Sequence, residues 1–186
     1  IILCQTGSVY QNCISSTVSI SSLTSFMNFF PSFNEALSYA EMGQYDVLPI
    51  SCQILSDAYT PIEVLRKLRN ISSHCYLLES ISDSSTWGRY TFLGFDPKLE
   101  LVCDNDTVYM DGIKVQSSDP SSFIRQILSQ YKSPKLTGFP SFTGGLVGYF
   151  SYDYLGYSEP TVRIKVQDTE GFKDVDLMLF DKVVAF

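Results

Sequence analysis

The sequence lacks several features that whole classes of protein require. It contains one histidine, His74, so a site that needs two histidines from this chain is excluded. Its five cysteines are odd in number and no two stand at C-x-x-C spacing, which argues for free thiols in a reducing compartment and against a disulfide framework or a zinc site. No apolar run approaches the roughly 18 to 20 residues that cross a bilayer.

Positive charge is also scarce. The 186 residues include 13 Lys and Arg against 20 Asp and Glu, a net charge of −7, and the basic residues form no cluster that could neutralise phosphates. We therefore expect neither a nucleic-acid partner nor a membrane-binding surface. The hydrophobic share of 45% and the charged share of 18% are typical of a folded domain.

The first 34 residues carry no charged side chain, and residues 1–26 are rich in Ser and Thr without a clear period. They have neither the basic start of a signal peptide nor the arginines of a transit peptide. We interpret 1–26 as a disordered or artefactual extension. Met27 is a possible true start, and residues 27–186 are predicted to form one domain.

Three segments have the sequence pattern of helices. Ser32 and Glu35 fit a capping box that opens an apolar stripe and ends at Gly43. Thr60-Pro61-Ile62-Glu63 repeats the pattern and opens a stripe of Val64, Leu65, Leu68 and Ile71. Asp119-Pro120 opens the third, whose predicted buried residues are Phe123, Ile124, Ile127, Leu128 and Tyr131.

Between and after these helices, short apolar or alternating runs predict strands. Asp111-Gly112 separates two of them and is a strong hairpin signal. The predicted strands are residues 76–79, 90–93, 99–103, 108–110, 113–115, 144–152 and 177–186. The order of elements predicts an α+β fold, a largely antiparallel sheet flanked by helices.

The first segment with possible chemistry is Leu77-Leu78-Glu79-Ser80, which reads as a buried strand that ends in a carboxylate and a hydroxyl. Such a pair could meet an amino acid, with Glu79 opposite the ammonium group and Ser80 opposite the carboxylate. On residue chemistry alone, a strand end whose polar groups bond to neighbouring backbone is the commoner arrangement.

The second segment, residues 87–94, holds Arg89, which could clamp a carboxylate, together with aromatic residues that could wall a pocket. The alternative is that Tyr90 and Phe92 pack on one sheet face while Arg89 forms an ion pair at the rim. The residues alone favour this structural alternative.

The third segment, residues 142–153, contains three glycines but neither the Walker spacing nor the G-x-G-x-x-G order, so phosphate binding is rejected. Glycines in such a strand more often allow a bulge or close backbone packing. Asp104, Asp106 and Asp111 lack the glycine and glutamate of a calcium loop and are better explained as turn residues. His74 and Cys75 are adjacent and would point to opposite faces of a strand.

Taken together, these segments resemble a known family. The motifs Asp57-Ala58-Tyr59-Thr60-Pro61, then Leu77-Leu78-Glu79-Ser80, then Arg89-Tyr90-Thr91-Phe92-Leu93-Gly94 are similar to the N-terminal region of anthranilate synthase component I. Residues 142–149 with Tyr152-Asp153 resemble that family's glycine-rich strand, and residues 176–181 its segment before the chorismate-binding region. The resemblance covers about residues 30–186, in the family's order.

The resemblance implies an enzyme, a lyase that converts chorismate and ammonia to anthranilate and pyruvate in cytoplasmic tryptophan biosynthesis. It implies a glutamine amidotransferase, component II, as the partner that delivers ammonia. The catalytic groups and the ligands of Mg²⁺ in this family belong to a C-terminal chorismate-binding region that this chain does not contain. We therefore expect no catalytic or metal-binding residue in this chain, an incomplete portion of the chorismate-utilising fold, and no turnover by the chain alone.

The resemblance also implies a binding site. In the family, the Leu-Leu-Glu-Ser motif lines the L-tryptophan feedback site, so Ser80 and Glu79 are the expected ligand-binding residues, with Leu78 and Arg89 as further candidates. Two other interpretations stay open: a fragment of aminodeoxychorismate synthase component I, which serves the folate pathway, and a stand-alone module that binds an amino acid. A gene remnant without function is a third.

Overall fold

The computed structural model describes residues 2–8, 28–79, 90–115, 119–159, 161–162 and 171–186. The chain divides into two compact units. Unit 1 comprises residues 1–97, 130–145 and 180–186, and unit 2 comprises residues 98–129 and 146–179. The sequence predicts one domain over 27–186. No local pattern in it indicates the points at which the chain passes from one unit to the other.

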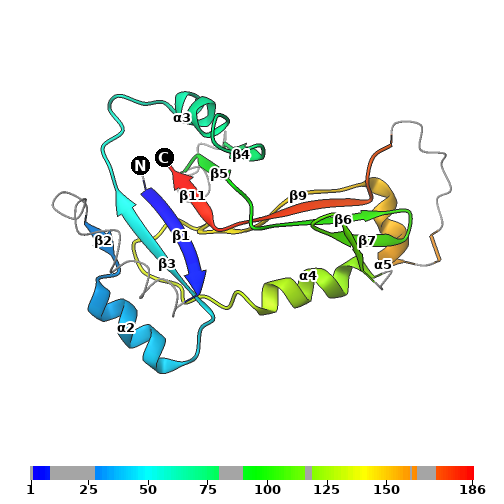
Figure 1. Cartoon of the computed structure of the whole chain (residues 1–186), viewed down its shortest axis with the longest axis horizontal. Helices are drawn as coiled ribbons and strands as arrows, with labels where there is room; N and C mark the ends of the chain where they lie inside the picture. The colour runs from blue at the N-terminus through cyan, green and yellow to red at the C-terminus, as the bar shows by residue number, and fades with distance from the viewer. Residues whose placement is uncertain (1, 9–27, 80–89, 116–118, 160, 163–170) are drawn as a thin grey trace. The chain divides into compact units, whose positions relative to one another are not determined.

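Unit 1 is built on an antiparallel sheet with the strand order β2-β3-β1-β11-β5-β4. Its strands are β1 (Ile2–Ser8), β2 (Phe29–Phe30), β3 (Val47–Gln53), β4 (Cys75–Leu78), β5 (Phe92–Phe95) and β11 (Lys182–Ala185). Strands from the two ends of the chain therefore lie side by side, as the blue β1 and the red β11 show in Figure 1.

Strand β1 corrects one sequence-based expectation. Residues 2–8 fall in the predicted disordered or artefactual extension, but their backbone pairs with β3 on one side and β11 on the other. Their Ser, Thr and Gly residues hide the alternating pattern that marks a strand. Residues 9–26 lie outside the described residues, and the boundary at Met27 stays a prediction.

Both predicted capping boxes in unit 1 are confirmed. Helix α2 (Phe33–Met42) begins at Ser32, whose backbone N–H donates to Glu35 at 2.8 Å, and its C-cap Gly43 has the left-handed φ of 60°. Helix α3 (Pro61–Leu68) begins at Thr60, whose N–H donates to Glu63 at 2.8 Å. Each box satisfies backbone donors that a helix start would otherwise leave unpaired.

Burial along these helices is narrower than their apolar stripes predict. In α2 the buried residue is Ala36, which packs with Leu48 of β3, whereas Phe33 is 57% exposed. In α3 the buried residue is Leu68, which packs with Leu93 and Val184 of the sheet. Ile71 follows the end of α3 and is 72% exposed.

Unit 2 has its own antiparallel sheet in the order β8-β7-β6-β10-β9. The strands are β6 (Leu99–Asp104), β7 (Thr107–Met110), β8 (Ile113–Val115), β9 (Gly145–Phe150) and β10 (Val175–Phe180). Its most deeply buried residues are Leu101, Cys103, Val108 and Val175, each with no exposed surface. The prediction of an α+β fold with largely antiparallel pairing is confirmed in both units.

The turns of unit 2 confirm the interpretation of its aspartates. Asn105 and Asp106 join β6 to β7 with φ values of 48° and 59°, and Asp111-Gly112 joins β7 to β8 with values of 50° and 76°. Consecutive left-handed residues match the right-handed twist of a two-residue hairpin, and Asn, Asp and Gly tolerate that conformation. Asp106 and Asp111 are therefore turn residues.

The helical segments of unit 2 are α4 (Pro120–Ser129), the 3₁₀ turn η1 (Tyr152–Tyr154) and α5 (Leu155–Ser158). The N–H of Ser121 donates to Asp119, which confirms a helix start at Asp119-Pro120. Ile127 is buried as expected, but Leu128 is 47% exposed, because it lies one residue beyond the face that packs inward.

One predicted strand proves to be two. Residues 177–186 were expected to form a single strand, but β10 belongs to the sheet of unit 2 and β11 to the sheet of unit 1. The interruption is Asp181, a carboxylate that is only 1% exposed. The acidic residue inside the apolar run indicates an interruption, but it does not indicate that its two sides join different sheets.

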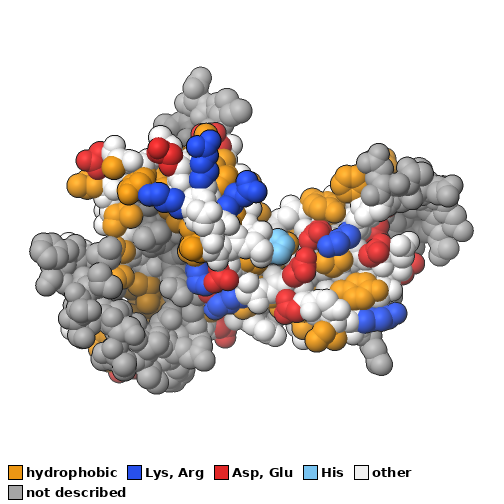
Figure 2. All heavy atoms as spheres, turned by 45° about the horizontal axis from the view of Figure 1, so that its top comes forward, with side chains coloured by type: hydrophobic (Ala, Val, Ile, Leu, Met, Phe, Trp, Pro, Cys, Tyr) orange, Lys and Arg blue, Asp and Glu red, His pale blue; other side chains and the backbone are white. Residues whose placement is uncertain are grey.

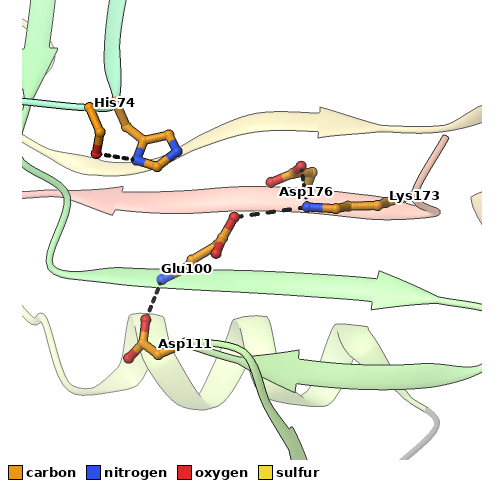
Figure 3. Close-up of polar contacts among 6 residues, drawn as sticks. His74, Glu100, Asp111, Lys173 and Asp176 are labelled. Carbon is orange, nitrogen blue, oxygen red and sulfur yellow. Dashed lines mark hydrogen bonds and ion pairs between the residues drawn. The ribbon is translucent and has the colours of Figure 1, made fainter. Parts of the chain in front are cut away.

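Charge on the surface is mixed. On the face drawn in Figure 2, acidic and basic side chains of the described residues are interspersed and form no broad basic field. In unit 2, Lys173 lies 3.0 Å from Asp176 and 3.9 Å from Glu100 (Figure 3), and the hydrogen bond to Asp176 raises the pKa of the Lys173 ammonium group. The Glu100 N–H in turn donates to Asp111 at 2.8 Å. None of the helices formed by the described residues has the length and apolar character of a membrane span.

Candidate binding site at the end of strand β4

The predicted ligand-binding residues follow one another at the end of β4. Leu78 is the last residue of the strand and is 48% exposed, and Glu79 comes directly after it with an exposed side chain. Ser80 and Arg89 lie outside the described residues. Of the predicted site, the structure therefore describes Leu78 and Glu79, and it brings both to the surface.

Among the strands of the described residues, β4 is at the edge of the unit 1 sheet and pairs with β5. The register sets Tyr76 opposite Gly94 and Leu78 opposite Phe92. Thr91 directly precedes β5. Its N–H donates to the C=O of Phe186 at 3.1 Å, and its C=O accepts from the N–H of Phe186 at 2.9 Å. The described residues that flank the segment 80–89 are thus held by backbone pairing on both sides.

The two faces of β4 differ in their neighbours. Cys75 and Leu77 pack with the cluster of Leu68, Leu93 and Val184, to which helix α3 contributes. Because successive residues of a strand alternate between faces, Tyr76 and Leu78 lie on the opposite face. Helix α3 therefore covers one side of β4, and the predicted site begins on the other side.

A cluster of aromatic rings occupies that second side. Tyr76 makes edge contacts with Phe180 at a centroid distance of 4.8 Å and with Phe142 at 6.5 Å. Phe92 lies 5.7 Å from Phe142 and 5.7 Å from Tyr90. The Tyr90–Phe92 pair confirms that these two rings pack together, as the structural interpretation of residues 87–94 proposed. We call Tyr76, Tyr90, Phe92, Phe142 and Phe180 the aromatic cluster.

Tyr76 is the unusual member of the aromatic cluster. Its hydroxyl is buried and bonds to no other group among the described residues, a costly state for a polar group removed from water. Burial raises the pKa of this phenol far above its ordinary value, so the hydroxyl stays neutral. Sequence reasoning missed Tyr76 and Phe142, because Phe142 comes from a segment distant in sequence and Tyr76 looked like an ordinary strand residue.

The described residues do not form a metal site: nowhere among them do three His, Cys, Asp or Glu side chains gather closely enough to hold an ion. His74, the single histidine, has its Nδ1 3.0 Å from the Ser73 hydroxyl (Figure 3).

A second polar cluster lies in unit 2. The Tyr157 hydroxyl donates to Asp174 at 2.7 Å and accepts from the N–H of Asp106 at 3.0 Å and the thiol of Cys103 at 3.4 Å. Asp174 also accepts from the N–H of Asn105 at 3.1 Å. These hydrogen bonds connect the β6–β7 turn to α5 and to the residue before β10. We interpret the cluster as stabilising the fold of unit 2.

The glycine-rich segment also has a structural explanation. A Cβ atom on Gly148 would lie 2.0 Å from the backbone oxygen of Asp176 on β10. The backbones of β9 and β10 approach too closely at this point for any other residue, which confirms close packing over phosphate binding.

Comparison with known proteins adds a consistent set of relatives. Anthranilate synthase component 1 of Pseudomonas putida is 35% identical over 158 residues, 82% of this chain and 32% of that protein. The same component of Aquifex aeolicus is 34% identical over 163 residues, 85% of this chain and 32% of that protein. A probable anthranilate synthase component 1 of Schizosaccharomyces pombe is 31% identical over 160 residues, which cover 86% of this chain and 30% of that protein. The chain spans about a third of the length of these curated relatives.

No family model matches the chain. A crystal structure of anthranilate synthase component I from Streptococcus pneumoniae is similar at 26% sequence identity with a TM-score of 0.46, over 72% of this chain and 28% of that one.

The identity shared with bacterial and fungal relatives over more than four fifths of the chain defines it as part of an enzyme component, a synthase subunit. More specifically, the chain is a homologue of anthranilate synthase component 1 over about a third of that protein. The resemblance drawn from the sequence motifs is thereby confirmed.

Proposed function

We propose that this chain is the N-terminal regulatory portion of an anthranilate synthase component I and carries part of a feedback site for L-tryptophan. The observation that carries the proposal is the position of the Leu-Leu-Glu-Ser motif in a homologue of that enzyme. Its residues Leu78 and Glu79 stand at the end of an edge strand, lie exposed, and adjoin a cluster of aromatic rings.

The chemistry of an aromatic amino acid suits this position. The exposed carboxylate of Glu79 is a partner for the ligand's ammonium group, and the Ser80 hydroxyl and the Arg89 guanidinium are partners for its carboxylate. Leu78 and the neighbouring rings supply apolar area for an indole. The remaining contacts would come from parts of the full-length protein beyond this chain.

The full-length protein is proposed to convert chorismate to anthranilate and pyruvate, as a lyase of tryptophan biosynthesis in the cytoplasm. Ammonia would come from a glutamine amidotransferase, component II. No group of described residues fits Mg²⁺, so the ion that this chemistry needs would be held by the rest of the protein. On this proposal the chain binds and regulates but does not catalyse.

The catalytic part of the proposal is tested with the purified 186-residue chain. Anthranilate is followed by its fluorescence, with chorismate, Mg²⁺ and ammonium supplied. We expect no product. Anthranilate formation by the chain alone would contradict the assignment of all catalytic groups to the rest of the protein.

The regulatory part is tested by Ser80→Ala in the full-length protein. Loss of one ligand hydrogen bond should weaken tryptophan inhibition by about threefold to tenfold and leave uninhibited turnover near the wild-type rate. Ser129→Ala is the matched control, because that hydroxyl bonds only to Gln126 of its own helix among the described contacts. Unchanged inhibition in Ser80→Ala would remove this residue from the site.

A further inference from the structure

The pair Asp111-Gly112 forms the tip of the β7–β8 hairpin and brings two reactive groups together. It is the single Asp-Gly pair in the sequence, which contains no Asn-Gly pair. Glycine has no side chain to shield its backbone nitrogen, so this nitrogen reaches the carboxyl carbon of a preceding aspartate more easily than the nitrogen of any other residue. Both residues are exposed, so water has access to them. The hairpin tip therefore holds a nucleophile and a carboxyl group that can form a cyclic imide.

The hairpin keeps the Asp111 carboxylate in a fixed place. Its Oδ1 accepts a hydrogen bond from the N–H of Glu100 on β6 at 2.8 Å (Figure 3), and the N–H of Asp111 donates to the carbonyl oxygen of Glu100 at 2.9 Å. Met110 and Ile113 are register partners and close the two-residue loop. A carboxylate bound to β6, on a backbone that is closed by pairing, has little freedom to turn towards the nitrogen of Gly112.

We propose that Asp111 is a latent site of isoaspartate formation, which the hydrogen bonds of the hairpin keep slow in the folded protein. Opening of this end of unit 2 releases the carboxylate and allows the reaction. The modification is independent of the proposed function. Its product, a free α-carboxylate beside a lengthened main chain, is a substrate for carboxyl methyltransferases that recognise isoaspartate and use S-adenosylmethionine as methyl donor.

The reaction has two steps, and its atoms balance. In the first step the nitrogen of Gly112 bonds to Cγ of Asp111, and one carboxyl oxygen leaves as water with the amide hydrogen and one proton. In the second step, water adds to the five-membered imide. Cleavage of the new N–Cγ bond restores aspartate, whereas cleavage of the original bond between the nitrogen and the main-chain carbonyl carbon gives isoaspartate. Water is the single co-reactant, and nothing is oxidised or reduced.

The modified hairpin would lose its present geometry. In isoaspartate the main chain runs through Cβ and Cγ, which adds one carbon to a two-residue loop that fits its strands closely. The register of Met110 with Ile113 would no longer match the loop, and the carboxylate would leave the N–H of Glu100. Modification at Asp111 should therefore loosen the pairing of β8 with β7.

The neighbouring turn supplies an internal control. Asp106 lies between β6 and β7, is exposed, and has a left-handed φ of 59°, close to the 50° of Asp111. The residue that follows it is Thr107, whose β-branched side chain shields the backbone nitrogen that would attack. The two aspartates thus share exposure and backbone conformation and differ in the nucleophile that follows them.

The test incubates the full-length protein near neutral pH at physiological temperature, both folded and unfolded in guanidinium chloride. Isoaspartate is quantified with an isoaspartate-specific methyltransferase and located by mass spectrometry of peptides. The variant Asp111→Glu keeps a carboxylate but would have to close a six-membered ring. The variant Gly112→Asn keeps a residue that tolerates the left-handed conformation and adds a side chain beside the nitrogen. Thermal unfolding verifies that each folded sample is folded.

In the unfolded wild type, we expect isoaspartate to form at least about tenfold faster at residue 111 than at residue 106, because glycine hinders the attack less than threonine. In the folded wild type, formation at residue 111 should be at least about tenfold slower than in the unfolded protein, because the hairpin must open first. Both variants should reduce the signal at residue 111 to the level of residue 106.

Equal rates at residues 111 and 106 in the unfolded wild type would overturn the inference, because the pair would then have no special reactivity. A folded rate equal to the unfolded rate would also overturn it, because the hydrogen bonds of the hairpin would then give no protection. Should a variant not fold, the folded and unfolded wild type decide the question without it.

Discussion

The ring of Tyr76 occupies the space that a side chain at position 94 would need: a Cβ atom built on Gly94 would lie 2.0 Å from Cε1 of Tyr76. The two residues are register partners on β4 and β5. A glycine on one strand thus makes room for an aromatic ring from the next, at the edge of the sheet where the predicted site begins.

Gly94→Ala should therefore destabilise unit 1. Real Cβ atoms do not approach other atoms this closely, so the ring must leave its place between Phe142 and Phe180, and we expect a loss of about 1–3 kcal/mol in the free energy of unfolding. Urea denaturation measures it. Tyr76→Ala should lower the free energy of unfolding less in the Gly94→Ala background than in the wild type. If the two losses were fully additive, the ring and position 94 would not compete for space.

Gly148→Ala should disturb unit 2 more severely, because the clash is with backbone. The new Cβ would meet the oxygen of Asp176, and neither strand can move aside without breaking its pairing. We expect hydrogen exchange of β9 and β10 amides to accelerate at least tenfold. Gly156→Ala is the control, since its nearest neighbour outside the turn is 3.9 Å away. Equal exchange in both variants would contradict the close approach.

The start of helix α3 should respond to acid. Hydrogen bonds from the backbone N–H and the hydroxyl of Thr60 lower the pKa of Glu63. A lowered folded-state pKa means that the stabilisation is present above the pKa of an unfolded glutamate, about 4.3, and is lost as the pH falls through the folded value. Glu63→Gln keeps a capping side chain without the titration. The stability difference between wild type and Glu63→Gln should shrink below about pH 4.3; a constant difference would contradict the role of the carboxylate.

The polar cluster of unit 2 should control access to Cys103. This thiol has no exposed surface, and burial raises its pKa, so it should react with iodoacetamide only when unit 2 opens. Tyr157→Phe removes the hydroxyl that bonds Asp174, Asp106 and Cys103, and should cost about 1–3 kcal/mol. Labelling of Cys103, located by mass spectrometry, should accelerate accordingly, whereas Tyr149→Phe on β9 should leave it unchanged. An unaltered rate in Tyr157→Phe would show that the cluster does not hold the unit closed.

Local signals in the sequence were reliable where their physics is local. The capping boxes at Ser32 and Thr60 satisfy backbone donors within three residues, so the pattern alone identifies them. The Asp111-Gly112 hairpin likewise needs only the left-handed tolerance of its two residues. The antiparallel α+β fold followed from the order of such elements.

Long-range arrangement was not predictable in the same way. Nothing near Ile2–Ser8 indicates a strand between β3 and β11, and nothing near Asp181 indicates that the segments on its two sides join different sheets. The aromatic cluster was not predictable for the same reason: Phe142 and Phe92 are distant in sequence and come into contact only in the folded chain. For the candidate site, family motifs supplied Leu78, Glu79, Ser80 and Arg89, whereas Tyr76 required the structure.

The pairing of β1 with β11 has a consequence for how this chain folds. The contact joins residues 2–5 to residues 182–185, so the middle of the unit 1 sheet cannot close until β11 has been synthesised. Contacts of such long separation slow folding, because loop closure costs entropy before any pairing is gained. Until β11 arrives, β1 and β5 each have an unpaired edge facing the gap, and nascent chains in that interval are open to pairing with one another.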